Sequence, residues 1–315
     1  MERKPVPTRD GFGEQLAVLG KNNPSVVVVS ADLEDATRAE YFKKACPERF
    51  FTLGIAEQDM IGMAAGLASE NFIAVTNSFA VFLTNRAYDQ IRMDVCYNNL
   101  NVKLIATHAG VTVGEDGASA QCLEDLAIMR VLPNMRVICP VDTLEARKAA
   151  DAIIAQSGPF YVRLSRSPLP VVTEEDSPFI VGKANMMCDG KDAAIIACGS
   201  MVSEALDAAR VLQGQNIHVR VVNMHTIKPL DTEMILDCAR TTGAVVTAEE
   251  HQLAGGLGSA VAEVLVRNYP VPVEMVGVDD SFGQTGTPEQ LLQHYRLKSV
   301  DIVAAVRKVI ARKKS

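Results

Sequence analysis

The chain has 315 residues, a hydrophobic content of 48% and a net charge of −7. This length exceeds that of one typical domain, so we expect about two domains with substantial cores. Nucleic acid is an unsuitable partner, because basic residues cluster only in the terminal ARKKS. The sequence contains no apolar run of about 18 residues and no signal-peptide core, which predicts a cytoplasmic protein without a membrane partner.

The cysteines indicate reduced thiols. Their number is odd and none has CxxC spacing, which argues against a disulfide framework and a zinc site. Most lie in apolar segments, where a thiol packs as a small hydrophobic group. Neither HExxH nor another metal-ligand cluster occurs, so we expect this chain to hold no metal by itself.

Short β-branched runs alternate with helix-period segments along the chain. The expected strands lie in 25–31, 50–54, 72–77, 102–110, 136–141 and 160–165, and then in 192–199, 218–224, 244–250 and 273–278. Helices are expected between them, for example over 203–214 and 257–268. This alternation predicts an α/β fold of two domains, each with a mainly parallel sheet flanked by helices.

The alternation is interrupted once, between about residues 165 and 190, where prolines and acidic residues replace it. We therefore predict a first domain over 1–176, a linker over 177–191 and a second domain over 192–315. No repeat relates the two halves.

Ligands of parallel sheets collect at the carboxyl ends of the strands, where loops and helix N-termini meet. This rule selects the polar residues that directly follow the first set of strands. They are Asp32, Glu57, Asn77, Ser78, His108, Asp116 and Arg166.

Taken alone, these residues leave structural alternatives open. An acid such as Glu57 in a first helical turn also complements the helix dipole. His108 could be a hydrogen-bonded structural histidine, and Phe79 and Phe82 could be core. The glycines in EEHQLAGGLGSAVAE could hold an anion at a helix start or serve close packing, although they do not match GxGxxG.

Several motifs together resemble the pyrimidine-binding domain of transketolases. They are SADLEDATR, FFTLGIAEQDMIGMAAGLA, NSFAVFLTNRAYDQIRMD, THAGVTVGEDGASAQCLEDLAIMRVLPN and YVRLSR, in that family's order and spacing. EEHQLAGGLGSAVAE and FGQTGTPEQLL extend the resemblance through a transketolase C-terminal domain. Deoxyxylulose-phosphate synthases and the β subunits of 2-oxoacid dehydrogenase first components share this layout.

The resemblance implies thiamine diphosphate as cofactor. Glu57 matches the glutamate that hydrogen-bonds a ring nitrogen of the aminopyrimidine and favours its proton-removing imino tautomer, which makes Glu57 a catalytic proton relay. Phe79 and Phe82 match residues that pack on the pyrimidine, and Arg86 would line the same pocket. Asp32 would lie at the cofactor edge or a subunit interface.

The resemblance also implies a sugar-phosphate site. Arg9 and Arg166 match the arginines that hold the phosphate group, a role suited to a planar fork of donors. His108 and Asp116 match residues that contact substrate hydroxyls, and we count His108 with the catalytic residues. Ala120 is a departure, because transketolases usually carry His or Gln at this position.

A larger departure concerns the diphosphate and its magnesium ion. In the family they are held by a GDG motif with a later Asn, in a domain that would precede this chain and has no counterpart here. We therefore expect the C-terminal subunit of a split transketolase, active with an N-terminal partner in a complex of two plus two subunits. It would transfer a two-carbon ketol unit between sugar phosphates.

Two other functions remain open from the sequence. A β subunit of a 2-oxoacid dehydrogenase would act on a pyruvate-like acid, for which the donors Arg9, His108 and Arg166 are not needed. A non-catalytic regulatory subunit is the third hypothesis, and Ala120 is the one residue that hints at it.

Overall fold

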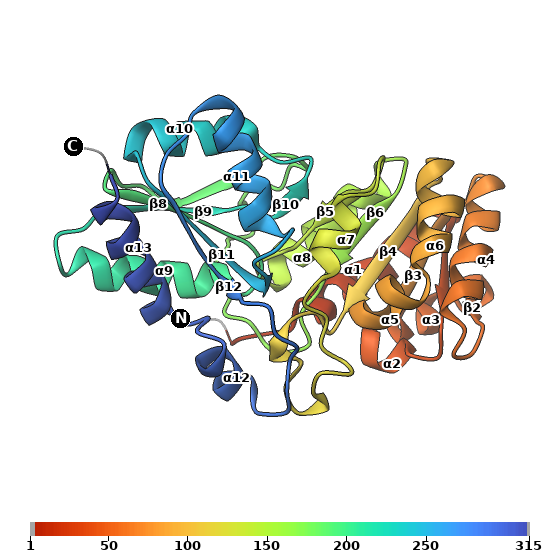
Figure 1. Ribbon diagram of the computed structural model, residues 1–315. Coiled ribbons are helices and arrows are strands. Elements are labelled where there is room, and N and C mark those ends of the chain that lie inside the picture. The colour runs from red at the N-terminus through yellow and green to blue at the C-terminus, as the bar shows by residue number, and fades with distance from the viewer. Residues whose placement is uncertain (1–3, 314–315) are drawn as a thin grey trace.

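The computed structural model describes residues 4–313 and contains two α/β domains that lie side by side (Figure 1). The first sheet has the strand order β10-β5-β6-β4-β3-β1-β2, and the second has the order β12-β11-β8-β9-β7. All pairs in both sheets are parallel except β10 with β5 and β7 with β9. The predicted fold class is confirmed.

The first sheet contains β1 (Val26–Ser30), β2 (Phe50–Thr52), β3 (Ile73–Phe79), β4 (Val102–Thr107), β5 (Arg136–Ile138), β6 (Phe160–Arg163) and β10 (Thr226–Lys228). Its helices are α1 (Thr8–Asn22), α2 (Glu34–Thr37), α3 (Glu40–Ala45), α4 (Glu57–Ser69), α5 (Ala80–Arg86), α6 (Tyr88–Gln90), α7 (Asp125–Arg130) and α8 (Thr143–Ile154). Short 3-10 turns η1 (Pro47–Arg49) and η3 (Val111–Asp116) and the π-helical η2 (Ile91–Tyr97) complete it.

The second sheet contains β7 (Asn185–Cys188), β8 (Ala193–Ala197), β9 (Val219–Asn223), β11 (Val245–Gln252) and β12 (Val273–Val278). Its helices are α9 (Met201–Gln213), α10 (Thr232–Thr242), α11 (Leu257–Asn268), α12 (Pro288–His294) and α13 (Ser299–Ala311). The helices expected over 203–214 and 257–268 are therefore present, as α9 and α11.

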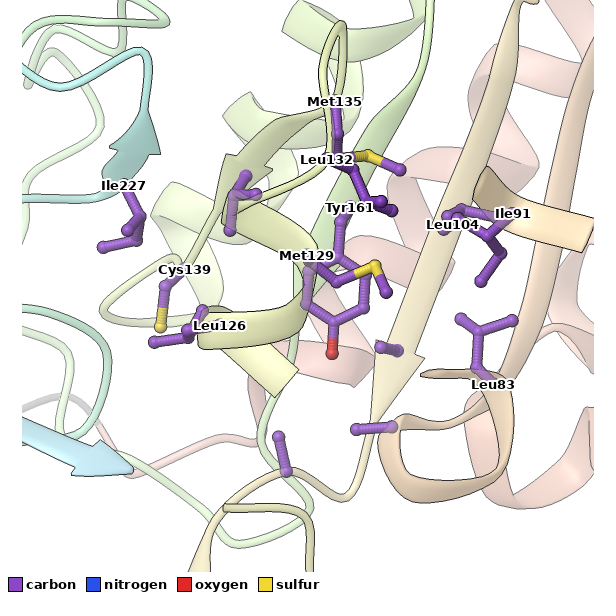
Figure 2. Packing of buried hydrophobic residues seen from close by; sticks show 14 of the residues in the cluster. Leu83, Ile91, Leu104, Leu126, Met129, Leu132, Met135, Cys139, Tyr161 and Ile227 are labelled. Carbon is purple, nitrogen blue, oxygen red and sulfur yellow. The ribbon is translucent and has the colours of Figure 1, made fainter. Parts of the chain in front are cut away.

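Helices cover both faces of the first sheet, as the run of four valines in the fully buried strand β1 predicts. Val26 and Val28 of β1 face α1, α3 and α8, whereas Val27 and Val29 face α4, α5 and η2. The second of these clusters continues into the other domain through residues of β8, α10 and α11. Figure 2 shows part of it, from Ile227 of β10 to Leu104 of β4. One of the apolar clusters thus spans both domains.

Both antiparallel strands escape sequence prediction because they are short. β10 follows β9 in the chain but pairs with β5 of the first sheet. β7 lies inside the predicted linker 177–191 and pairs with β9, so the last part of that segment belongs to the second sheet. Its four residues show no alternation of buried and exposed positions.

All seven cysteines are free thiols, and all but Cys188 are buried.

Candidate active site

Glu57 is the first residue of α4 and lies where the chain turns back from β2. Gly54, with a φ of 74°, makes this turn in a backbone region that favours glycine. The Glu57 side chain is only 5% exposed, and its Oε1 accepts a hydrogen bond of 3.0 Å from Nη1 of Arg86. The carboxyl group is therefore buried and held from one side.

Aromatic rings lie next to this carboxyl group. Phe79 ends β3. Phe82 lies on α5 one helical turn before Arg86, so the side chains of Phe82 and Arg86 lie on the same face of that helix. The two rings stack with centroids 5.5 Å apart, and the Arg86 guanidinium lies 4.2 Å from the Phe82 ring centroid. Both rings are partly buried. The arrangement can hold a flat heterocycle beside a hydrogen-bonding carboxyl group.

His108 extends the row of rings at the end of β4. Its ring stacks on Phe79 with centroids 3.7 Å apart. Nε2 lies 3.3 Å from Nη1 of Arg9, and Nδ1 lies 2.8 Å from Oγ1 of Thr107. Because arginine can only donate, Nε2 of His108 accepts from Arg9, and Nδ1 is protonated and donates a hydrogen bond to Oγ1 of Thr107.

The His108 imidazole is neutral over the physiological range. Burial, followed by the positive charges of Arg9, Arg166 and Arg38, lowers its pKa to about 3. A neutral histidine with a fixed tautomer can orient a hydroxyl group or relay a proton, but it cannot supply a permanent charge.

Positive charge comes from the arginines around His108. Burial and then Arg38 lower the pKa of Arg9. Nη1 of Arg9 donates to the Ala36 carbonyl at 2.6 Å, while its buried Nε has no hydrogen-bond partner among residues 4–313. Mutually repelling guanidiniums with a spare donor suit an anion such as a phosphate group.

Arg166 follows β6 and approaches the glycine-rich loop. Its Nη1 donates to the Val113 carbonyl at 2.6 Å, and its other nitrogen lies 3.8 Å from the exposed Asp116. Ala120, in the same loop, is buried.

Asp32 stands apart from this group. It follows β1 with a φ of 61° and is exposed. Over the described range 4–313, no hydrogen bond or ion pair joins its side chain to the other candidates. The structure thus brings Glu57, Arg86, Phe82, Phe79, His108 and Arg9 into one continuous row of contacts, with Arg166 and Asp116 beside it.

Sequence reasoning missed Arg38 and Thr107. Arg38 donates from Nε to Oδ1 of Asp10 at 2.7 Å and adds to the positive charge at His108. It lies inside the motif SADLEDATR, which was the available signal. Thr107 directly precedes His108, and its role depends on the ring orientation that only coordinates provide.

Two polar side chains near the end of β3 each have an atom that lacks a partner among residues 4–313. Nδ2 of Asn77 and Oγ of Ser78 are buried without a hydrogen-bond partner in the described part of the chain. The carboxyl group of Glu57 beside the stacked rings of Phe79 and Phe82 fits the flat, nitrogen-containing ring of a thiamine-type cofactor. In residues 4–313 no cluster of three or more His, Cys, Asp or Glu side chains could hold a metal ion, and no helix is long and apolar enough to cross a membrane.

Comparisons with known proteins match both domains. Residues 4–172 match the family model "Transketolase, pyrimidine binding domain", and residues 182–302 match "Transketolase, C-terminal domain". A putative transketolase C-terminal section of Methanocaldococcus jannaschii is 45% identical over 301 residues, which cover 95% of this chain and 94% of that protein.

A solved structure and a full-length relative agree with this result. The structure, a split gene transketolase in an inactive β4 tetramer, superimposes with a TM-score of 0.91 at 47% identity and covers 98% of this chain and 100% of its own. Transketolase of Homo sapiens is 36% identical over 311 residues. These residues cover 98% of this chain and 49% of the human protein. The chain therefore belongs to the transketolase family of thiamine diphosphate-dependent transferases.

Proposed function

We propose that this chain is the C-terminal subunit of a two-subunit cytoplasmic transketolase. The complex would transfer a two-carbon ketol unit from a ketose phosphate to an aldose phosphate. The observation that carries this proposal is the buried carboxyl group of Glu57 beside the stacked rings of Phe79 and Phe82, on the same row as His108 and Arg9. A cofactor-ring site and an anion site are thus adjacent.

In this proposal the side chains around Glu57 hold the cofactor ring. Bound thiamine diphosphate supplies a carbanion-stabilising centre. Glu57 holds a proton at the pyrimidine ring, and Phe79 and Phe82 hold the ring flat, with Arg86 fixing the carboxyl group and lining the pocket. Asp32 lies at the cofactor edge or at a subunit interface.

The substrate residues follow from charge and hydrogen bonding. Arg9 and Arg166 bind the sugar phosphate through their forked donors. His108 contacts a substrate hydroxyl with a fixed, neutral ring and assists proton movement there, and Asp116 contacts a second hydroxyl. We also propose that residues 1–176 form the pyrimidine-binding domain, 177–191 the linker and 192–315 the C-terminal domain.

An N-terminal subunit would hold the diphosphate and its Mg²⁺. This is supported by two relatives, a putative transketolase C-terminal section and a split gene transketolase chain, which this chain matches over 94% and 100% of their own lengths. The split-gene relative is an inactive tetramer of β chains, which favours a need for a second kind of subunit. We propose two copies of each subunit.

The alternatives are a β subunit of a 2-oxoacid dehydrogenase and a regulatory partner. The arginines around His108 disfavour the first, because a pyruvate-like acid lacks the sugar hydroxyls and phosphate that this set would bind. The buried contact of Glu57 with Arg86 disfavours the second, because regulation alone requires no buried acid beside a ring site.

The test is reconstitution. An open reading frame that encodes GDG and a later Asn beside this gene would identify the partner, and both proteins would be purified separately. We expect ketol transfer between sugar phosphates, dependent on thiamine diphosphate and Mg²⁺, only when both are mixed. Full activity of this chain alone would refute the divided site, and decarboxylation of a 2-oxoacid by the mixture would favour the dehydrogenase alternative.

A further inference from the structure

The loop after His108 is held by the second domain. It runs over 109–121, includes η3 and Asp116, and provides the Val113 carbonyl that Arg166 binds. The loop therefore links His108, which directly precedes it, with Asp116 and Arg166. Two buried side chains, Glu250 and Gln121, fix it at several backbone positions.

Glu250 lies near the end of β11 and is 3% exposed. Its Oε1 accepts a hydrogen bond of 2.7 Å from the backbone N–H of Thr112, and its Oε2 accepts one of 2.5 Å from Oγ of Ser200. Gly110 has a φ of 86°, and a Cβ there would lie 2.2 Å from Glu250 Oε1. The backbone after His108 therefore approaches this carboxyl group as closely as glycine permits.

Gln121 closes the loop at its other end. Its Nε2 donates to the carbonyls of Val111 at 3.2 Å and Gly114 at 3.3 Å, and to that of Gln284 in the second domain at 3.0 Å. The amide group is 4% exposed, and its Oε1 has no hydrogen-bond partner within residues 4–313. The site therefore needs a donor at position 121 and an acceptor at position 250.

We propose that Glu250 and Gln121 are positioning residues for sugar-phosphate recognition. No hydrogen bond or ion pair among residues 4–313 joins either side chain to the row of site residues, but both fix the loop that carries Asp116 and supports Arg166. The second domain thereby sets the geometry of the substrate site without contributing to it directly. This inference rests on the proposed ketol-transfer function.

The test exchanges acid and amide at the two positions in the reconstituted complex. Glu250→Gln keeps an oxygen that can accept from Thr112 and should retain kinetics near wild type, whereas Glu250→Ala removes it. Gln121→Glu keeps the shape but loses the donor. For Glu250→Ala and Gln121→Glu we expect the KM for sugar phosphates to rise by about tenfold or more, within what a misplacement of about 1 Å can cause.

In the same variants we expect kcat and the KM for thiamine diphosphate to change by less than about threefold, because no hydrogen bond or ion pair in the described residues joins the loop to Glu57 or Phe82. The matched control is Glu249→Ala. Glu249 is equally buried, and its oxygens accept from the backbone N–H groups of Leu257 at 2.7 Å and Gly258 at 2.8 Å, inside the second domain. Folded Glu249→Ala should keep the wild-type KM for sugar phosphates.

A second readout needs no activity. Amide hydrogen exchange over 109–117, measured on this chain alone, should accelerate by about tenfold in Glu250→Ala and stay unchanged in Glu249→Ala. An unaltered KM in Glu250→Ala within an active complex would overturn the inference and leave the proposed function intact. An inactive wild-type complex would refute the proposed function. In that case, equal exchange rates over 109–117 in Glu250→Ala and wild type would also refute the positioning role of Glu250.

Discussion

The carboxyl ends of the two sheets serve different purposes, although both sheets have the same α/β construction. At the first sheet, Phe79 remains partly exposed, and the Arg86 side chain that binds Glu57 is 50% exposed. At the second sheet, Asn223 and Glu249 are fully buried and Glu250 nearly so. One sheet end is open to a ligand, and the other is occupied by protein.

This difference follows from where the second sheet directs its polar residues. Asn223 at the end of β9 donates to Oε1 of Glu145 on α8, and Glu250 at the end of β11 accepts from Thr112. Both partners belong to the first domain. The rule that ligands bind at carboxyl ends of parallel strands therefore locates a candidate site in one domain and a domain interface in the other.

The largest expected effect is on catalysis at the open end. Glu57→Gln keeps the size of the side chain but removes the acid needed for proton relay. We expect kcat of the reconstituted complex to fall by about 10²- to 10⁴-fold, as for loss of a general acid or base. Steady-state kinetics at saturating thiamine diphosphate measures this effect.

The matched change at the occupied end is Glu249→Gln. It should leave kcat within about twofold, because Glu249 accepts from backbone N–H groups of α11 and lies 3.6 Å from His251, and none of these groups belongs to the row of site residues. Equal losses of rate in the two variants would remove the distinction between the two sheet ends. A fully active Glu57→Gln complex would favour the purely regulatory alternative.

Sequence patterns predicted the open end better than the occupied end. Glu57 is found because a short strand, Gly54 and a helix start are adjacent in sequence, and the motif then supplies its role. Arg9 lies 99 residues from His108, so only the family resemblance could bring them together. The sequence predicts that Glu250 ends a strand. Its contact with Thr112 depends on how the two domains pack, and the local hydrophobic pattern carries no information about that packing.

The next largest effect concerns the stability of the interface. Asp125 is fully buried, and its Oδ2 accepts from Nε of Arg163 at 2.8 Å and from the Tyr161 hydroxyl at 2.7 Å. Arg163 also donates to the Glu250 carbonyl at 2.8 Å. Asp125→Ala leaves this guanidinium buried without its counter-ion, so the free energy of unfolding should fall by about 3–5 kcal/mol.

Urea denaturation measures this loss, and an exposed ion pair provides the control. Asp207 and Arg210 are 54% and 76% exposed, so Asp207→Ala should change the free energy of unfolding by less than about 1 kcal/mol. Comparable losses for the two variants would show that the Asp125 pair is not an essential part of the domain interface.

A pH-dependent effect is expected at Glu145, which joins α8 to the second domain. Burial raises the pKa of Glu145 to about 8, while its hydrogen bonds from Val141 and Asn223 act in the opposite direction. Between about pH 4.5 and 8 the folded state then binds a proton that the unfolded state has lost. Wild-type stability should therefore fall with rising pH, relative to Glu145→Gln, by up to about 1.4 kcal/mol per pH unit.

Urea denaturation of both proteins at pH 5, 6, 7, 8, 9 and 9.5 isolates this contribution, because the other titrating groups are common to them. The gap should become constant above about pH 8. Parallel stability profiles of wild type and Glu145→Gln across this range would show that Glu145 has an ordinary pKa and that this part of the interface is hydrated.

The smallest expected effect returns to the open end, at His108. His108→Asn removes the ring stacked on Phe79 and the acceptor for Arg9, so the KM for sugar phosphates should rise about tenfold, or about 1.4 kcal/mol. Because burial and then Arg9 lower the pKa of His108 to about 3, wild-type kcat/KM should show no ionisation of this residue between pH 5.5 and 8.5. A wild-type inflection near pH 6.5 that disappears in His108→Asn would instead mean that water reaches this ring, and that the open end extends deeper than the contacts with Phe79 and Arg9 indicate.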